Sequence, residues 1–267
     1  MDKRDLQELL EHAIDLAHTA GKKILAARSD HVTEKEDGSP LTAADLASHR
    51  AIVSGLESLK TGFPTLSEEG NSDQKGCLSG QNYWLIDPLD GTKEFIKGNG
   101  EYTVNIALVE NNRPVLGVIH PPEQGWTCYA SRGGGAHRLS GRDSLESLPR
   151  TRNESHPPTG AISRSHPSPR TRELLAGWGI ERVLRRGSSL KFCIVADGAA
   201  DVYPRPNPTC LWDTATGTII AREAGCRVVD MNGDDLLHDP AGGIKHSGFV
   251  VYRPRRDVDL AMPARPQ

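Results

Sequence analysis

The sequence predicts an α/β protein of the α+β kind, and three observations support this fold class. Apolar residues recur at helical spacing along the N-terminal part of the chain. Between residues 83 and 130, short runs rich in β-branched and aromatic residues follow one another. Beyond residue 158, short strand-like runs alternate with helical patterns, which favours an α/β second half. A chain of 267 residues can form one large domain or two closely joined ones.

Two helices are expected before the first strand. The first runs from about Asp5 to Ala27, because leucine, isoleucine and alanine residues repeat there along one helical face. Asp37-Gly38 and Ser39-Pro40 then give turn signals. The second helix follows Thr42 as its N-cap and continues to about Leu59.

Short strands make up the next part of the chain. We expect them at Tyr83–Ile86, Tyr102–Val109, Val115–Ile119 and Trp126–Ala130. The residues 110–113 between two of them are predicted to form a hairpin turn. The run Gly133–Gly135 is predicted to be a β-turn rather than a phosphate-binding loop, because no Lys-Ser/Thr pair follows it.

The polar, proline-containing segment Asp143–Pro158 is predicted to separate two halves, residues 1–150 and 151–267. The second half contains strand patterns at residues 161–163 and 201–204, and helical patterns at Pro169–Trp178, Ser189–Ala196 and Thr214–Ala224. Gly225 suits the C′ position of the last helix. The tail from Arg253, rich in proline and arginine, is expected to be frayed.

Composition excludes several classes of protein. A formal net charge of -3 argues against a binder of polymeric nucleic acid. No segment approaches the roughly 20 apolar residues of a membrane span, and the N-terminus lacks a secretory h-region. The five cysteines are widely spaced without a CxxC pair, which predicts free thiols in a reducing cytoplasm. The sequence leaves open peripheral association with the inner membrane, and it permits a homodimer.

The stretch WLIDPLDGT, residues 84–92, carries the clearest chemical signal. Pro88 has no N–H, so we expect the strand to end at Asp87 and the chain to turn Asp90 back towards it. Two neighbouring carboxylates repel each other, and a hard divalent cation removes that penalty. The Leu89 carbonyl offers a further oxygen. Spacing alone therefore favours a metal site over a purely structural turn.

Other polar residues extend this signal. Gly91 permits close approach of a ligand, and the Thr92 hydroxyl with the following backbone N–H groups suits phosphate oxygens. Glu68-Glu69, Asp213 and Asp45 lie at or beside predicted element ends. Each of these acids also has an ordinary interpretation, as loop charge, as a helix N-cap and as a first-turn residue respectively.

Four longer stretches stand in order along the chain, namely DGSPLTAAD, LSEE, WLIDPLDGTKEFIKGNGEYTVNIALV and LWDTATGTIIAREAG. On these motifs the sequence resembles the lithium-sensitive, magnesium-dependent phosphatase superfamily, which includes the inositol monophosphatases. The resemblance extends from the first helix to about Asp230. It implies a layered α/β/α/β/α sugar-phosphatase fold, Mg²⁺ as cofactor and inhibition by lithium.

Three further details, DGTKEFIK, ISRSHP and GSSLKFC, resemble the bacterial bisphosphate nucleotidase branch of that superfamily. The resemblance implies removal of the 3′-phosphate from adenosine 3′,5′-bisphosphate, giving AMP and phosphate, in connection with sulfate assimilation. A phosphatase for inositol phosphate or fructose 1,6-bisphosphate is the alternative within the same class. A binding protein that retains the fold and a metal or phosphate ligand without catalysis is the alternative from another class.

The resemblance also assigns roles to residues. It implies two or three Mg²⁺ ions held by Glu68, Asp87, the Leu89 carbonyl, Asp90 and Asp213. It implies that Asp45 and Thr92 orient the attacking water. The implied contacts with the substrate are Gly91, Thr92, Ser163, His166, Ser188, Lys191 and Asp213. The ordinary interpretation is that Ser188 or Ser189 caps a helix, that Lys191 is solvated and that His166 is a loop residue.

Overall fold

The structure is a computed structural model that describes residues 1–27, 32–35, 38, 40–70, 82–141, 144–150, 157–166 and 168–255. Both predicted N-terminal helices are confirmed, as α1 (Lys3–Ala26) and α2 (Ala43–Ser58). Thr42 caps α2 in a capping box with Asp45. The Thr42 side chain accepts from the backbone of Asp45, and the Asp45 side chain accepts from the backbone of Thr42. The short strands β1 (Val32–Glu34) and β2 (Pro40–Thr42) pair between the two helices.

The strands of the first half form one seven-stranded sheet. In spatial as in chain order they are β3 (Thr65–Ser67), β4 (Tyr83–Asp90), β5 (Thr103–Glu110), β6 (Arg113–His120), β7 (Trp126–Ser131), β8 (Gly135–Ser140) and β9 (Ser144–Ser147). Only the β3–β4 pair is parallel among them. The predicted hairpin is confirmed, with Asn111 and Asn112 at φ 50° and 61°, as a two-residue turn between twisted strands requires.

Pro88 does not end its strand at Asp87, so that prediction is wrong. β4 continues to Asp90, and its register against β5 shifts between Asp87 and Asp90. A residue without an N–H is tolerated in such an irregularity because no ladder hydrogen bond is required there. The Pro88 carbonyl instead accepts a hydrogen bond from the Ser48 hydroxyl of α2 at 2.6 Å. The short helix α3 (Thr92–Ile96) follows directly.

The second half holds a five-stranded sheet and three helices in the described residues. The helices, all predicted, are α4 (Pro169–Gly177), α5 (Leu190–Ala196) and α6 (Ala215–Glu223). The sheet has the order β11 (Arg182–Arg186), β10 (Thr159–Ser163), β12 (Val202–Arg205), β16 (Phe249–Tyr252), β14 (Arg227–Asp230). A two-stranded ribbon joins β13 (Thr209–Cys210) to β15 (Lys245–His246), and η2 (Pro240–Gly242) is a short 3₁₀ helix. Only β10 and β12 of these strands were predicted.

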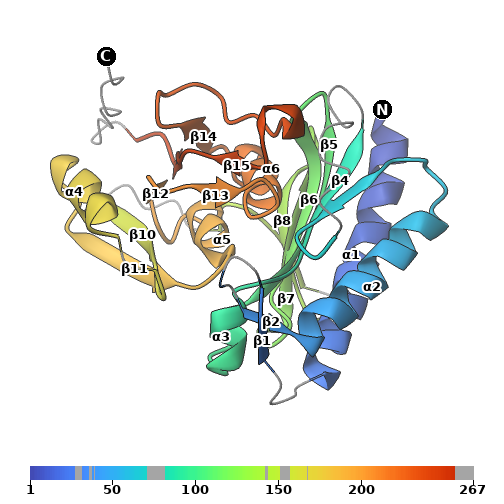
Figure 1. The fold of residues 1–267 in the computed structure, drawn as a ribbon. Coiled ribbons are helices and arrows are strands. Elements are labelled where there is room, and N and C mark those ends of the chain that lie inside the picture. The colour runs from blue at the N-terminus through green and yellow to red at the C-terminus, as the bar shows by residue number, and fades with distance from the viewer. Residues whose placement is uncertain are drawn as a thin grey trace.

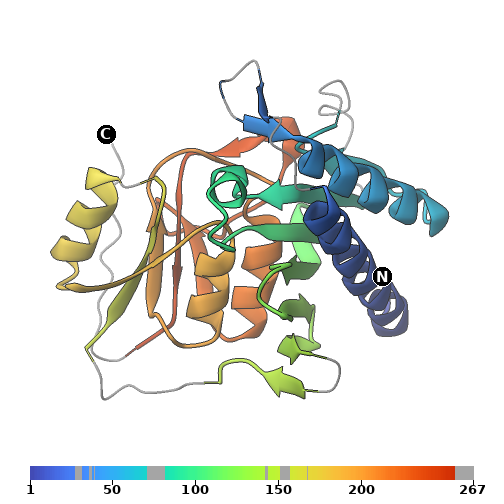
Figure 2. The same ribbon diagram turned by 90° about the horizontal axis from the view of Figure 1, so that it is seen from below.

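Helices and sheets alternate in α/β/α/β/α layers, which confirms the fold implied by the resemblance (Figures 1 and 2). The helices α1 and α2 pack on one face of the seven-stranded sheet through residues such as Ile52 and Trp84. A second core joins α5 and α6 to both sheets and includes Ile119 and Phe192. A third lies under α4 and includes Leu175.

The helix α6 is held tightly between the two sheets. A β-carbon at Gly117 of β6 would lie 2.6 Å from Cγ2 of Ile219, so only glycine permits this approach. At the end of α6, the Glu223 carboxylate accepts hydrogen bonds from the N–H groups of Gly133 and Gly135, both at 3.0 Å. The glycine run is thus the predicted turn between β7 and β8, and it also anchors a helix.

Two further predictions about chain segments need correction or limits. The start of the predicted frayed tail is ordered, because the Arg253 guanidinium donates to the carbonyls of Val195, Ala196 and Ala224 at 2.9–3.3 Å. The rest of the predicted tail, residues 256–267, lies outside the described residues. The predicted seam contains β9, while residues 151–156 lie outside the described residues. The division of the chain at residue 150 stays a prediction.

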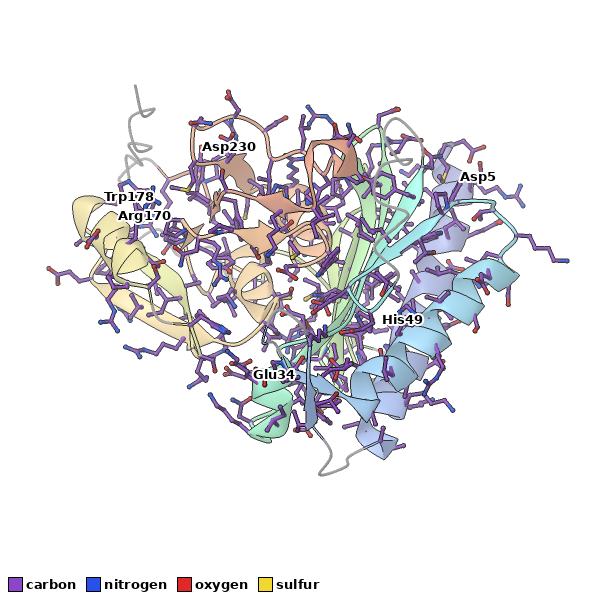
Figure 3. The ribbon with its side chains drawn as sticks, viewed as in Figure 1. Asp5, Glu34, His49, Arg170, Trp178 and Asp230 are labelled. Carbon is purple, nitrogen blue, oxygen red and sulfur yellow. The ribbon has the colours of Figure 1, made fainter. Side chains whose placement is uncertain are left out.

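None of the described cysteines forms a disulfide, namely Cys128, Cys193, Cys210 and Cys226, and Cys77 lies outside the described residues. None of the helices in the described part of the chain combines the length and apolarity that crossing a bilayer requires. The side chain of His49, on α2, contacts β3 through Ser67, with 2.8 Å between Nδ1 and Oγ (Figure 3).

Candidate active site

A cavity of about 300 Å³ lies where the two halves meet. Its lining comes from the end of β4, from α3, from the segments after β3 and β10, and from α5, β12 and the start of α6. Among the predicted site residues, the lining includes Glu68, Asp87, Leu89, Asp90, Gly91, Thr92, Ser163, His166, Ser188, Lys191 and Asp213. Asp45 is buried behind this surface and reaches it through a hydrogen bond to Thr92.

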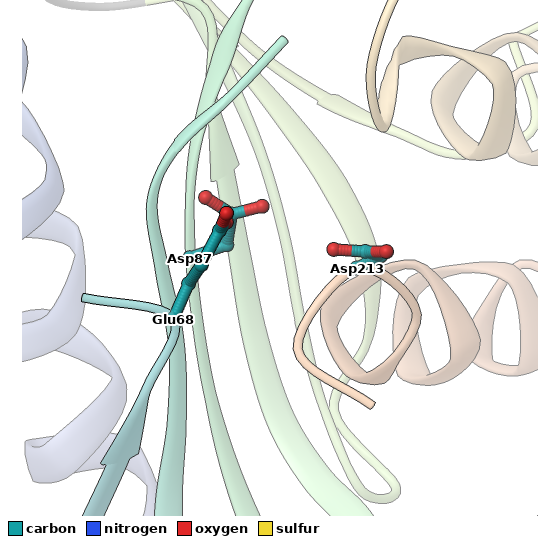
Figure 4. A group of neighbouring side chains, drawn as sticks. All are labelled: Glu68, Asp87 and Asp213. Atoms are coloured by element: carbon teal, nitrogen blue, oxygen red, sulfur yellow. The ribbon is translucent and has the colours of Figure 1, made fainter. Parts of the chain in front are cut away.

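Carboxylates gather at one end of the cavity. Oxygens of Glu68, Asp87 and Asp213 all lie within 4.8 Å of one another. Glu68 and Asp87 come from the seven-stranded sheet, and Asp213 faces them from the start of α6 (Figure 4). We call these three residues and the adjacent Asp90 the acidic cluster.

The irregular end of β4 sets the positions of Asp87 and Asp90. Oδ1 of Asp87 accepts a hydrogen bond from the Leu89 N–H at 3.1 Å, which fixes the carboxylate over the turn. Oδ2 of Asp90 accepts one from the Ser189 hydroxyl at 2.7 Å. Gly91 follows with φ 93°, a left-handed conformation that favours glycine and directs the chain into α3.

Asp213 is not the N-cap of α6. Its Oδ2 accepts hydrogen bonds from the Thr209 hydroxyl at 2.7 Å and from the Cys210 N–H at 3.0 Å, both upstream in the chain. The N-cap position belongs to Thr214, whose side chain makes no capping hydrogen bond. The β13 segment therefore holds one oxygen of Asp213 while the residue lines the cavity.

Burial and mutual repulsion disfavour negative charge throughout the acidic cluster. Burial, then repulsion from Glu68 and Asp90, raises the pKa of Asp87 well above its usual value. Burial, then repulsion from Asp90 and Glu68, raises the pKa of Asp213 to about 7. Burial also raises the pKa values of Asp90 and Glu68. These acids ionise easily only if a cation is close to them.

One cation already contacts the edge of the acidic cluster. Lys35, which follows β1, places its ammonium nitrogen 2.8 Å from Oε1 of Glu68 and 2.5 Å from Oε1 of Glu69. Glu69 is therefore a partner of Lys35 and not a free loop charge. A single positive charge leaves most of the negative charge of the cluster unbalanced.

The donor set fits a hard divalent ion. Carboxylate oxygens and a backbone carbonyl, here that of Leu89, are the ligands that Mg²⁺ and Ca²⁺ prefer, and no soft sulfur ligand lines the described cavity. A divalent ion would also reverse the raised pKa values that burial imposes on these acids. The acidic cluster is therefore suited to bind a metal ion.

Asp45 has both roles that the sequence offered for it, because it lies in the first turn of α2 and it also contacts Thr92 of the cavity. Its Oδ2 accepts hydrogen bonds from the N–H of Thr42 at 2.8 Å and from the Thr42 hydroxyl at 2.5 Å. Its Oδ1 accepts a hydrogen bond from the Thr92 hydroxyl at 3.2 Å. Burial raises the pKa of Asp45. One oxygen thus closes the capping box, and the other is directed to the cavity through Thr92.

Basic side chains line the same cavity. We call His166, Lys191 and Arg205 the basic set. Burial raises the pKa of Asp90 in the acidic cluster, and Lys191 is near enough for its charge to oppose this larger effect. Lys191 is buried, so its ordinary interpretation as a solvated charge is wrong. Burial lowers the pKa of Lys191 to about 8, and its ammonium group donates a hydrogen bond to the Ser188 carbonyl.

The two predicted serines have different surroundings. Ser163 accepts a hydrogen bond from the backbone N–H of His166 at 3.1 Å, which shapes the turn after β10. Nε2 of His166 lies 3.2 Å from the Lys93 ammonium, which can only donate, so Nε2 is unprotonated. Ser188 has φ 42°, an uncommon left-handed conformation for a residue other than glycine. Such backbone strain concentrates at functional sites.

Sequence reasoning missed several residues of this site. Ser189 occupies the N-cap position of α5 but binds Asp90 instead of the helix, and Asn105 of β5 donates to Ser189 at 2.9 Å. Thr209 was missed because its only signal is proximity to Asp213 in the chain. Glu94, inside the DGTKEF motif, also lines the cavity.

The layered fold and the carboxylate-lined cavity define the sugar-phosphatase class of α/β proteins. Residues 5–256 match the profile of the Inositol monophosphatase family. The chain therefore belongs to the inositol monophosphatase family, as its motifs predicted. The resemblance drawn from the sequence is confirmed at this level.

Curated relatives narrow the comparison to one branch of the family. The 3′(2′),5′-bisphosphate nucleotidase CysQ of Salmonella typhimurium is 43% identical over 248 residues, which cover 91% of this chain and 99% of the relative. The protein of the same name from Escherichia coli strain K12 is 41% identical over 248 residues, with the same coverage.

Solved structures agree with this placement. The crystal structure of CysQ from Bacteroides thetaiotaomicron, described as a bacterial member of the inositol monophosphatase family, superposes with a TM-score of 0.81. It is 40% identical, and the match covers 94% of this chain and 98% of that one. The Thermotoga maritima IMPase is 27% identical, with a TM-score of 0.76 and 92% coverage of both chains.

Proposed function

We propose that this protein hydrolyses the 3′-phosphate of adenosine 3′,5′-bisphosphate to AMP and phosphate, a reaction linked to sulfate assimilation. The observation that carries the proposal is the cavity itself, about 300 Å³ in volume, whose wall holds both the acidic cluster and the basic set. The acidic cluster suits a metal-bound phosphate, and the basic set suits a second anionic group on the same molecule. Relatives at 41–43% identity carry the name of this activity.

We further propose that Mg²⁺ is the metal and that two or three ions bind. Glu68, Asp87, Asp90, Asp213 and the Leu89 carbonyl would hold them. When bound, such ions supply Lewis-acid stabilisation of phosphate charge and favour the ionisation of water.

Thr92 and Asp45 would handle the proton of the attacking water. The Thr92 hydroxyl lies at the cavity surface and donates to Oδ1 of Asp45 at 3.2 Å. As water attacks phosphorus, its proton can pass to Oγ1 of Thr92 while Thr92 passes its own proton to Asp45. The raised pKa of buried Asp45 makes it a better proton acceptor than an exposed aspartate.

The basic set would recognise the part of the substrate that does not react. Lys191 and Arg205 offer positive charge to the remaining phosphate, and His166 and Ser163 lie beside them in the cavity wall. Ser188, next to Gly91 in space, would contact the sugar phosphate from the α5 side.

Phosphate release from adenosine 3′,5′-bisphosphate, inositol 1-phosphate and fructose 1,6-bisphosphate, with and without Mg²⁺, tests the proposal. We expect Mg²⁺-dependent turnover that is fastest with the nucleotide and that lithium inhibits. Asp90→Asn is the matched control for contaminating phosphatase, because it should abolish turnover in a folded protein. Preferred hydrolysis of inositol 1-phosphate would support the alternative substrate class. Metal binding without turnover of any ester would support a binding protein.

Three related expectations belong to the same proposal. The preferred partner is a small nucleotide bisphosphate and not polymeric nucleic acid. A homodimer and a cytoplasmic location stay predictions. Each can be measured directly, by sedimentation of the purified protein and by cell fractionation.

A further inference from the structure

Glu94 is a buried carboxylate that neither the metal chemistry nor the basic set uses. It is the third residue of α3, only 3% exposed, and it lines the same cavity as the acidic cluster. Carboxylates are rarely this buried unless they are paired or bind a ligand. Its burial therefore requires an explanation.

Two glycines make room for the Glu94 side chain. A β-carbon at Gly187 would lie 2.7 Å from Cγ of Glu94, closer than side chains pack. A β-carbon at Gly91 would lie 3.3 Å from Oε2 of Glu94. The side chain thus passes beside Gly187, and its carboxylate ends next to Gly91, at the turn that carries Asp90 and Thr92.

The cations near Glu94 act on it only through space, because their hydrogen bonds go to other groups. Glu94 is among the acids whose charge favours the protonated forms of Lys191 and Arg164. The Lys191 ammonium, however, donates to the Ser188 carbonyl, and Arg164 forms a bidentate pair with Glu101. Within the described residues, no hydrogen bond or ion pair reaches the Glu94 carboxylate. A buried anion left in this state is costly, so a donor in the cavity is the natural partner.

The position of Glu94 restricts what that donor can be. A phosphate would be repelled, and Glu94 already raises the pKa of Asp90 by repulsion, after the larger effect of burial. A neutral hydroxyl or amino group can donate to a carboxylate without this penalty. Because Glu94 lies beside Gly91, the donor must be close to the phosphate that this turn would hold. On a 3′-phosphorylated nucleotide the sugar hydroxyl on the next carbon meets this condition, whereas the exocyclic amino group of the base is many bonds away from the 3′-phosphate.

We propose that Glu94 accepts a hydrogen bond from the substrate hydroxyl next to the phosphate that is cleaved, and so determines specificity for a vicinal hydroxyl phosphate. For adenosine 3′,5′-bisphosphate this group is the 2′-hydroxyl, so the inference rests on the proposed function. Glu94 thus recognises the sugar of the substrate, whereas the basic set recognises its second phosphate.

The test compares kcat/KM for adenosine 3′,5′-bisphosphate with that for its 2′-deoxy analogue. Wild-type protein should prefer the ribonucleotide by about tenfold to a hundredfold, the usual worth of a hydrogen bond to a charged group. Glu94→Ala should reduce this preference to within about twofold, the scatter of uncoupled sites. Glu94→Gln keeps the size and one acceptor and should give an intermediate preference.

Controls separate this inference from general effects of charge. Glu173→Gln removes an exposed carboxylate charge on α4, outside the cavity lining, and should leave the preference unchanged. The inference is overturned if wild-type protein hydrolyses both substrates equally, or if Glu94→Ala keeps the full preference. It is also overturned if the variants lose discrimination against the inosine analogue instead, which would place Glu94 at the base. Absence of turnover of either nucleotide by wild-type protein would refute the proposed function itself.

Discussion

Three members of the acidic cluster lie in or directly after two neighbouring strands of one sheet, whereas the basic set is assembled from separate elements of the second half. Glu68 follows β3, and Asp87 and Asp90 belong to β4, its parallel neighbour. His166, Lys191 and Arg205 come from a turn, from α5 and from the end of β12. The groups suited to metal are thus fixed by strand pairing, while the groups suited to recognition stand on elements that can vary independently.

The two regions are nevertheless joined by hydrogen bonds. Ser189, beside the basic set in the chain, donates to Asp90 of the acidic cluster at 2.7 Å. Asn105, from the middle of the seven-stranded sheet, donates to Ser189. Changes in the acidic cluster should therefore affect the hydrolysis of every substrate, whereas changes in the basic set should affect which substrate is preferred.

The largest expected effect is that of Asp87→Asn. We expect kcat/KM to fall at least about a hundredfold for every substrate, as when other enzymes lose one electrostatic contact with the transition state. In EDTA at neutral pH, the same change should raise the midpoint of thermal unfolding by about 3 °C. Asp87 must either bury a charge or bind a proton when the metal-free protein folds, and asparagine needs to do neither. Activity assays and calorimetry measure the two effects.

Asp235→Asn is the control for this pair of effects. Asp235 is exposed and paired with Arg113 outside the cavity, and its hydrogen bond with Arg113 lowers its pKa. Its neutralisation should leave kcat/KM unchanged and should not raise the unfolding midpoint. If Asp87→Asn kept a tenth or more of the activity, the acidic cluster would not be the reaction centre.

A smaller and more selective effect is expected from Lys191→Met. The KM for adenosine 3′,5′-bisphosphate should rise about tenfold, because a charged contact to the second phosphate is lost. The KM for adenosine 3′-monophosphate, which lacks that phosphate, should change much less. Lys97→Met serves as control, since Lys97 is exposed and binds Ser165. An equal rise for both substrates would remove Lys191 from recognition.

The smallest expected effect concerns stability and pH. Raised pKa values mean that the folded, metal-free protein binds more protons than the unfolded chain. Stability is therefore fully present below the ordinary aspartate pKa of 3.8 and is lost as pH rises towards the value of about 7 at Asp213. Mg²⁺ should oppose this loss. The gap between unfolding midpoints in Mg²⁺ and in EDTA should widen by about 3 °C from pH 5 to pH 7.

The unfolding midpoint in EDTA must be compared with the midpoint in Mg²⁺ at each pH, because buried histidines also make stability depend on pH. Burial lowers the pKa values of His120 and His246 to about 4, so they add stability as pH rises from about 4 to 6.5. They contribute equally with and without metal and cancel in the gap. A gap that stays constant over this range would contradict the raised pKa values of the acidic cluster.

Half of the acidic cluster could be predicted from local evidence. Asp87 and Asp90 stand close together beside a proline and a glycine, so their spacing alone indicates a metal site. Glu68 and Asp213 joined the predicted set only through the resemblance to a family, because nothing local brings them to Asp87. The prediction erred at Pro88, where the register shift lets β4 continue to Asp90. The register shift depends on the pairing of β4 with β5. The expectation that a proline ends a strand considers one strand alone and therefore cannot predict such a shift.

The missed residues depend on contacts between distant segments. Glu94 is an ordinary helical charge in the sequence, and its burial follows from Gly187 of the second half. Ser189 resembles a helix cap until Asp90 is placed beside it. Strand β16 pairs with both β12 and β14, although it lies far from β12 in the sequence. Neither β14 nor β16 shows a clear alternation of polar and apolar residues that would have predicted a strand. Tertiary packing decides each of these cases.

The helix α6 begins directly after Thr214, two residues after Asp213, and it ends at Glu223, whose carboxylate accepts hydrogen bonds from two backbone N–H groups of the β7–β8 turn. The C-terminal end of α6 is thus fixed to the seven-stranded sheet, in or beside which the other three acids lie. The length of α6 therefore sets the distance between this anchor and Asp213. Removing one residue from it would turn Asp213 by about 100° and retract it by about 1.5 Å. The number of residues in α6 is therefore as much a part of the acidic cluster as the carboxylate it presents.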